Sequence, residues 1–195
     1  MDYEDMDKET LIKILRKKDA VLEKLYLERE KLNYYADTDV MTGVLNRRSG
    51  LELLDKEFNL SKTGNTNLVV CFVDVDGLKA VNDNFGHQEG DKLLINTVKI
   101  LKDSIRRTDF VIRMGGDEFL VVFLDTAMGE VYKIWHRIEE KLKERNENNG
   151  NYNFSLSCGF CECGKGMQSG ISMEDLIKNA DFEMYKEKLQ KKKEL

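Results

Sequence analysis

Two fully apolar runs stand out along the chain, Leu68 to Val73 and Phe119 to Leu124. Short runs of this kind are typical of buried strands. A polar turn, Arg113 to Glu118, precedes the second run and contains two adjacent glycines, which can adopt the positive φ that a tight hairpin needs. The pattern therefore predicts a hairpin whose first strand covers 110–112, together with a separate strand at 68–74.

Elsewhere apolar residues recur every three or four positions, which is the spacing of amphipathic helices. One helix is expected to end around Phe58, two to follow the first strand, one to follow the hairpin and one to close the chain. A mostly antiparallel sheet flanked by helices satisfies this order, because a hairpin pairs locally while longer crossovers lay helices on the sheet faces. The last four helices are expected at about 77–85, 93–105, 128–146 and 173–189, a loop at 61–67 and a final strand at 152–160.

Residues 1–36 form a separate unit in which leucines recur at alternating steps of four and three, with Lys18 and Arg29 interrupting the same face. The leucines are Leu11, Leu15, Leu22, Leu25 and Leu32. This spacing is typical of a helix of coiled-coil character, which would serve as a dimer stalk or connector, or else fold back singly on the rest of the chain. The short polar residues at 37–39 favour a turn, so a second unit is predicted at 37–195.

The length of 195 residues and the 41% hydrophobic content suffice for one core with an appendage. A net charge of −5 gives no long-range attraction to nucleic acid or to an anionic membrane. A phosphate-bearing ligand would therefore have to be held by local groups or by a metal. No apolar run is long enough to span a bilayer, and no basic segment followed by an apolar one opens the chain. We expect a cytoplasmic protein that binds no nucleic acid and does not insert into membranes.

Acidic residues close the first strand and follow the glycine pair of the hairpin. A carboxylate at the end of a buried strand needs partners, and a cation shared between Asp74 and Asp117 or Glu118 would supply them. Taken alone, the hairpin is more simply a solvated acidic turn. Asp76 is expected to cap the helix that follows it.

Polar residues on the two helices after Asp74 suggest a ligand. Lys79 lies early in a helix, where its charge opposes the helix dipole and favours an anionic partner. Asn82 and Asp91 flank the break between the helices, and an amide and a carboxylate brought together there can hydrogen-bond the edge of a guanine. Each of the three residues taken singly is more simply an exposed polar side chain.

Four stretches of the sequence carry a family resemblance: DVMTGVLNRR, FVDVDGLKAVNDNFGHQEGD, RRTDFVIRMGGDEF and ADFEMYKEK. Together they resemble the GGDEF-domain diguanylate cyclases from about Asp39 to Lys188. Agreement over so many spaced positions is specific, whereas one glycine pair or acidic pair would mean little. The resemblance implies an α/β fold, an α+β sandwich with a mixed five-stranded central sheet and flanking helices, similar to nucleotidyl cyclases and polymerase palms and here preceded by an N-terminal helix.

The resemblance implies condensation of two GTP into cyclic di-GMP with release of two pyrophosphates. Asp74, the carbonyl of Val75, Asp117 and Glu118 would serve two divalent ions per GTP, Mg²⁺ or Mn²⁺. Such ions would neutralise the triphosphate, polarise the α-phosphorus and lower the pKa of the attacking ribose 3′-hydroxyl. An acidic side chain of the turn would accept its proton.

The resemblance also implies which residues hold the substrate. Asn82 and Asp91 would read guanine, and Asp91 favours GTP over ATP. Arg113 would brace the turn or contact phosphates. The groups implied at the phosphates and the turn are Lys79, Lys188, the N–H groups of Gly77 and Leu78, and Gly115 and Gly116.

Two further properties follow from the resemblance. One domain holds one GTP, so catalysis needs a homodimer with a half-site on each subunit, and orienting the subunits would control the rate. Arg106 and Asp109 match the R-x-x-D motif at which the family binds its cyclic product as an inhibitor, and Arg137 would add a second arginine. Without the family match, Arg106 and Asp109 would be read as a solvated ion pair.

The sequence departs from the family pattern at two places. Leu78 replaces the usual phenylalanine, and Lys191 to Lys193 replace a Gly-Arg-Asn tail, where Lys192 offers a point charge in place of a planar fork. The alternative function is a catalytically inactive GGDEF domain that acts as a receptor for cyclic di-GMP or GTP or as an interaction module. A degenerate turn would indicate that alternative, and the turn is intact.

Overall fold

The computed structural model describes residues 6–64, 66–148, 152–164 and 171–194. The chain divides into two compact units, Met1–Asp37 and Thr38–Leu195. The predicted beginning of the first helix, at residues 1–5, lies outside the described residues. None of the described helices combines the length and the hydropathy needed to cross a membrane.

The first unit contains a single long helix, α1 (Lys8–Asp37). Asp7 caps its start, because one carboxylate oxygen accepts hydrogen bonds from the backbone N–H groups of Glu9 and Thr10 at 2.9 and 3.0 Å. Of the predicted leucine seam, Leu22 and Leu32 are 63% and 69% exposed. An apolar stripe of this kind on a long helix is stabilised chiefly by packing against a partner.

The second unit is built on a five-stranded sheet with the order β1-β3-β4-β2-β5. β2 pairs antiparallel with both β4 and β5, β3 pairs antiparallel with β4, and β1 pairs parallel with β3. The mixed five-stranded sheet that was expected is therefore confirmed. Its strands are β1 (Leu45–Asn46), β2 (Leu68–Val75), β3 (Phe110–Gly115), β4 (Glu118–Leu124) and β5 (Leu156–Cys163).

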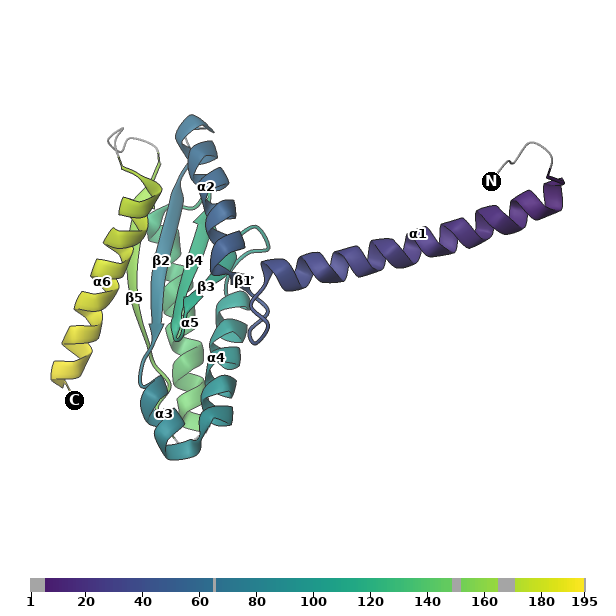
Figure 1. Cartoon of the computed structure of the whole chain (residues 1–195). Helices are drawn as coiled ribbons and strands as arrows, with labels where there is room; N and C mark the ends of the chain where they lie inside the picture. Colours follow the sequence, from purple (N-terminus) through teal and green to yellow (C-terminus); the bar gives the residue numbers. More distant parts are fainter. Residues whose placement is uncertain (1–5, 65, 149–151, 165–170, 195) are drawn as a thin grey trace. The chain divides into compact units, whose positions relative to one another are not determined.

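Helices cover both faces of this sheet (Figure 1). Because side chains alternate along a strand, Val69 and Val73 of β2 pack into one apolar cluster with α4 and α5, whereas Val70 and Phe72 pack into another with α2 and α6. Burial on both faces explains why β2 reads as a continuous apolar run, since each such side chain contributes about 1.5–3 kcal/mol. The helices are α2 (Arg47–Gly64), α3 (Leu78–Phe85), α4 (His87–Lys102), α5 (Met128–Asn148) and α6 (Met173–Glu194).

Several elements differ from the prediction, and among them α4 begins at His87 instead of at about residue 93. The strand β1 was not predicted, because two residues are too few to show a period. The helix α2 continues to Gly64 through the predicted loop, since the hydroxyls of Ser61 and Thr63 donate to carbonyls of the same helix instead of interrupting it. The strand β5 begins at Leu156, because the side chain of Asn146 binds both the N–H and the carbonyl of Phe154 and so takes the backbone bonds of the preceding segment.

Candidate active site

The ends of β2 and β4 bring the predicted acidic residues together. Asp74 lies directly opposite Glu118 in the antiparallel register, and the N–H of Val75 donates to the carbonyl of Asp117 at 3.0 Å. Residues directly opposite each other on neighbouring strands have Cβ atoms about 4.5–5.5 Å apart. The carboxylates of the first strand and of the glycine turn therefore share one edge of the sheet.

Burial and mutual repulsion act on these carboxyl groups. Asp74 is only 5% exposed, and burial raises its pKa even though Lys188 opposes the shift. Burial also raises the pKa of Glu118, and the charges of Asp117 and Asp74 raise it further. Two neighbouring carboxyl groups whose pKa values are raised together form a site that gains from an added cation.

A lysine from the last helix, α6, supplies one positive charge to this group of carboxylates. Lys188 Nζ lies 2.6 Å from Asp74 Oδ1, and the two residues are 114 positions apart in the sequence. Burial lowers the pKa of Lys188, but the hydrogen bond and the charge of Asp74 more than offset this, so the pKa is raised. Lys188 is thus a full cation placed against the buried carboxylate.

A close approach of α6 to β5 sets the position of Lys188. A Cβ atom on Gly159 would lie 2.1 Å from both the carbonyl oxygen of Ala180 and the backbone nitrogen of Met184. Only glycine permits this contact. Farther along α6, Glu187 accepts hydrogen bonds from the backbone N–H of Cys158 at 2.9 Å and forms an ion pair with Lys191 at 2.6 Å, which anchors the helix one residue before Lys188.

The residues present fit a metal that arrives with a phosphate ligand. Among the described residues, no group of three or more His, Cys, Asp or Glu side chains is placed to enclose an ion. Mg²⁺ usually takes one or two protein carboxylates and obtains its other ligands from water and substrate phosphates. Asp74 and Glu118 supply two carboxylates, and Asp117 lies next to Glu118 in the turn. Within the described residues, the protein alone does not enclose an ion.

The glycine turn between β3 and β4 is held by an arginine. Gly116 adopts a φ of 44°, and the register shifts between Arg113 and Gly115, as in a bulge. Arg113 donates to the carbonyl of Gly116 from Nη2 at 2.8 Å and to Asp39 Oδ1 from Nη1 at 2.9 Å. The side chain of Arg113 therefore braces the turn against the loop that enters the domain.

Asp39 is a site residue to which sequence reasoning gave no role. Its Oδ1 accepts the N–H and the hydroxyl of Thr42 as well as Arg113. Burial acts to raise the pKa of Asp39, but the hydrogen bonds from Thr42 and Arg113 outweigh burial and lower it. The Asp-x-x-Thr spacing, which is typical of a side chain that binds the backbone ahead of it, was the available signal.

The end of β2 corrects one prediction. Asp76 does not cap α3: the N-cap is Gly77, with a φ of 74° and no side-chain cap. The carboxylate of Asp76 instead accepts hydrogen bonds from the hydroxyls of Ser155 and Ser157, both at 2.8 Å. The capping prediction was wrong because these two hydroxyls come from another part of the chain, and the bonds tie the end of β2 to β5.

The two helices after β2 place the predicted ligand-binding residues near one another. Lys79 is exposed in the first turn of α3, and Leu78 is half-buried beside it. A Cβ on Gly90 would lie 2.0 Å from Asn82 Oδ1, so the amide of Asn82 packs directly on the backbone of α4, next to Asp91. Gly90 is thus a second residue that sequence reasoning missed, and its role becomes visible only when the two helices pack.

The R-x-x-D segment before β3 is a tight turn held by its own aspartate. Asp109 is 7% exposed, and its two carboxylate oxygens accept the backbone N–H groups of Arg106 and Leu124 at 3.0 and 3.1 Å. Arg106 is exposed, and Arg137 donates to the carbonyl of Ser104 just before it at 2.9 Å. The structure therefore brings both predicted arginines to this turn, while the carboxylate of Asp109 accepts hydrogen bonds from backbone N–H groups.

Comparisons with known proteins agree with this geometry. The family model of the diguanylate cyclase GGDEF domain matches residues 36–194. Among curated proteins, diguanylate cyclase DgcP of Escherichia coli is 30% identical over 184 residues, which are 90% of this chain and 51% of that protein. Diguanylate cyclase DosC of Escherichia coli is 34% identical over 151 residues, which are 75% of this chain and 32% of DosC. This chain thus spans about half or less of the length of these relatives.

The fold comparison gives the same result. The coiled coil and GGDEF domain of DgcB from Caulobacter crescentus, solved in complex with c-di-GMP, matches with a TM-score of 0.81 and 25% identity, covering 93% of this chain and 95% of the solved chain. Diguanylate cyclases of this family generally depend on a divalent metal. The acidic strand end, the intact glycine turn and these matches lead to one conclusion: the chain belongs to the GGDEF-domain diguanylate cyclase family.

Proposed function

We propose that this chain condenses two molecules of GTP into cyclic di-GMP and releases two pyrophosphates. The observation that carries the proposal is the pairing of Asp74 with Glu118 across neighbouring strands, with Lys188 bound to Asp74. A buried carboxylate group of this kind is costly unless a cation or a ligand uses it. The matched relatives DgcP and DosC are named diguanylate cyclases, which supports the same reaction.

Asp74, Glu118, Asp117 and the carbonyl of Val75 would hold two Mg²⁺ or Mn²⁺ ions per GTP. Such ions, when bound, supply neutralisation of the triphosphate and a lower pKa for the ribose 3′-hydroxyl. Glu118 would also be the acidic side chain of the turn that accepts the proton of that hydroxyl. Lys188 and Lys79, with the N–H groups at the start of α3, would bind the β- and γ-phosphates.

The assay that tests this function uses the purified chain, GTP and Mg²⁺, with cyclic di-GMP and pyrophosphate measured separately. Both products are expected from the wild type and neither from Glu118→Ala. Formation of neither product by the wild type, with cyclic di-GMP binding retained, would instead support the receptor alternative. The intact glycine turn and the paired carboxylates favour the enzyme.

Guanine recognition is assigned to Asn82 and Asp91. Gly90→Ala is expected to raise the KM for GTP about tenfold, because the new Cβ, only 2.0 Å from Asn82 Oδ1 in the present geometry, displaces the amide and one hydrogen bond to guanine is worth about 1–1.5 kcal/mol. Alanine also favours the helix backbone, so the free energy of unfolding should fall little. Steady-state kinetics with GTP together with urea unfolding separate the two effects, and an unchanged KM would contradict the assigned role of Asn82.

Product inhibition is assigned to Arg106, Asp109 and Arg137. Arg106→Ala should raise the concentration of cyclic di-GMP needed for half-inhibition at least tenfold, since a guanidinium–phosphate pair is among the strong charge-assisted bonds. The turn itself should persist, because Asp109 binds the backbone N–H of Arg106 and not its side chain. Arg107→Ala removes the same charge from the next residue and is the matched control, expected to leave inhibition intact. Equal inhibition of the wild type and Arg106→Ala would refute the assignment.

Catalysis would proceed in a homodimer, with residues 1–36 as the connecting helix and residues 37–195 as the catalytic domain. The exposed leucines of α1 support this proposal, since they form an apolar stripe suited to a second copy of the same helix. Two bound substrates held in line gain much of the rate from positioning alone. Anything that changes the register of the two α1 helices would then change the rate of synthesis.

A further inference from the structure

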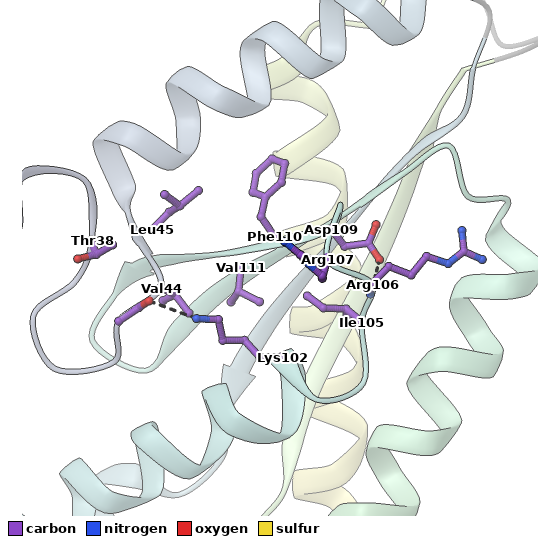
Figure 2. A pocket seen from close by; sticks show the side chains of 11 residues that line it. Thr38, Val44, Leu45, Lys102, Ile105, Arg106, Arg107, Asp109, Phe110 and Val111 are labelled. Carbon is purple, nitrogen blue, oxygen red and sulfur yellow. Dashed lines mark hydrogen bonds between the residues drawn. The ribbon is translucent and has the colours of Figure 1, made fainter. Parts of the chain in front are cut away.

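A cavity lies at the end of the sheet away from Asp74, between the loop that enters the domain and the connection from α4 to β3 (Figure 2). Its volume is about 420 Å³, within the range of pockets that hold small molecules. Phe110, which lines the cavity, lies in register with Val122 of β4 and Val70 of β2. Asp74 lies four residues farther along β2, in register with Glu118. The cavity is therefore separate from the candidate active site.

The walls of this cavity are mainly apolar. Of the lining residues, Val44 and Val111 are buried, while Leu45, Ile105 and Phe110 are only half-buried. These three half-buried side chains leave apolar surface facing a concavity. An apolar ligand body would remove that surface from water, which is worth roughly 25 cal/mol per Å².

The charged groups at the rim are basic. Lys102 and Arg107 line the opening and, within the described part of the chain, neither forms an ion pair. Lys102 Nζ donates only to the carbonyl of Gly43, at 3.3 Å, which is long for such a bond and easily exchanged for an anion. The acidic group among the lining residues, Asp109, uses both oxygens on backbone N–H groups.

This cavity adjoins the R-x-x-D turn, since Arg106 and Asp109 are among its lining residues. Figure 2 shows the side chain of Arg106 extending away from Lys102 and from Leu45, on the other side of the turn. The charge of Arg106 acts on Glu130 of α5, which does not line the cavity. A ligand in the cavity would thus contact Lys102 and Arg107, while the side chain of Arg106 extends to the other side of the shared turn.

We propose that the cavity between the 38–45 loop and the α4–β3 connection binds a small organic anion with an aromatic or branched apolar body. The anionic group would form an ion pair with Lys102 and replace its hydrogen bond to the carbonyl of Gly43. Such a ligand would bridge the entry loop to β3. The entry loop carries Asp39, which holds Arg113 and through it the glycine turn. The proposal concerns binding and does not depend on the cyclase activity.

The test uses the whole chain and two dyes of nearly equal shape, the anionic 8-anilinonaphthalene-1-sulfonate and the neutral N-phenyl-1-naphthylamine. Amide chemical shifts in ¹⁵N-labelled protein are expected to change with the anion at residues 43–45 and 105–111, and binding of the neutral dye there should be at least fivefold weaker. Lys102→Met keeps the apolar stem and should weaken binding of the anion at least fivefold. Lys99→Met, one turn earlier on α4 and outside the lining, is the matched control and should bind as the wild type does.

A second variant blocks the cavity without touching a charge. Ile105→Trp places a larger side chain in the space and should abolish the shift changes at 43–45, with thermal unfolding used to verify that the domain stays folded. If Ile105→Trp unfolds, binding of the anion to Lys102→Met is the deciding measurement. Absence of shift changes at these residues, equal binding of the two dyes there, or unchanged affinity in Lys102→Met would each overturn the proposal.

Discussion

Asp74→Asn is expected to abolish cyclic di-GMP synthesis while leaving the protein at least as stable as the wild type at neutral pH. The activity should fall by about 10³-fold or more, because loss of a metal-binding carboxylate removes several kcal/mol of transition-state stabilisation, and each 1.36 kcal/mol is a factor of about ten. The measurement is the initial rate of product formation from GTP and Mg²⁺.

The stability half of this prediction follows from the pKa of Asp74, which burial raises above its ordinary value of 3.8. Native Asp74 therefore holds its proton to a higher pH than unfolded Asp74 does. Protonated Asp74 contributes its full stability when the pH is below the ordinary pKa of the unfolded chain. This contribution is lost as the pH rises through the raised pKa of the folded state. Asparagine resembles the protonated form at every pH, so the variant escapes this loss.

Urea unfolding of the wild type and Asp74→Asn at pH 5 and pH 8 measures the difference. The wild type should lose stability relative to the variant as the pH rises. Asp55→Asn, an exposed position on α2, is the control and should change neither the rate nor the pH dependence. A folded variant that keeps its activity would remove Asp74 from the proposed site, and a variant that unfolds would contradict the expected stability.

Gly159→Ala is expected to lower the free energy of unfolding by about 1–3 kcal/mol or more and to impair catalysis as well. The new Cβ would lie 2.1 Å from backbone atoms of Ala180 and Met184, so α6 has to move away from β5. Because α6 also carries Lys188, its displacement should lengthen the contact of Lys188 with Asp74. The expected result is a less stable enzyme with a raised KM for GTP.

The matched control for this variant is Gly129→Ala. Gly129 lies in the first turn of α5 with no atom within 4 Å of a Cβ placed on it, so alanine should stabilise the chain by about 0.4–1 kcal/mol. Denaturant unfolding and GTP kinetics of both variants are compared with the wild type. Wild-type stability in Gly159→Ala would mean that α6 and β5 are not held as closely as the structure indicates.

Local sequence patterns predicted most of the elements well. A strand such as β2, with both faces buried, reads as one apolar run, and α4 and α5 show the helical period clearly, since each packs one face on the sheet. The fold class was confirmed in the same way, helped by the family motifs. Among the misplaced boundaries were those of α2 and β5, where single side chains of Ser61 and Asn146 decide which backbone bonds form.

The contacts of the candidate site depend on residues far apart in the sequence. The acidic turn and Asp74 can be recognised in the sequence, but the capping prediction for Asp76 failed because Ser157 of β5 and Ser155 just before it reach Asp76. The pairing of Arg113 with Asp39 spans 74 positions. No local period records such a contact, because it depends on the packing of elements that are not neighbours in the chain.

The sequence by itself determined which residues carry charge, which segments become strands or helices, and that a glycine turn with two carboxylates stands beside an acidic strand end. Only the tertiary structure decided that Lys188 is the cation on Asp74, that Gly90 fixes Asn82, and that a cavity opens beside Lys102. The physical reason is that secondary structure responds to the spacing of apolar groups within a few residues. The partners of a buried polar group are set instead by how closely packed layers bring distant segments together.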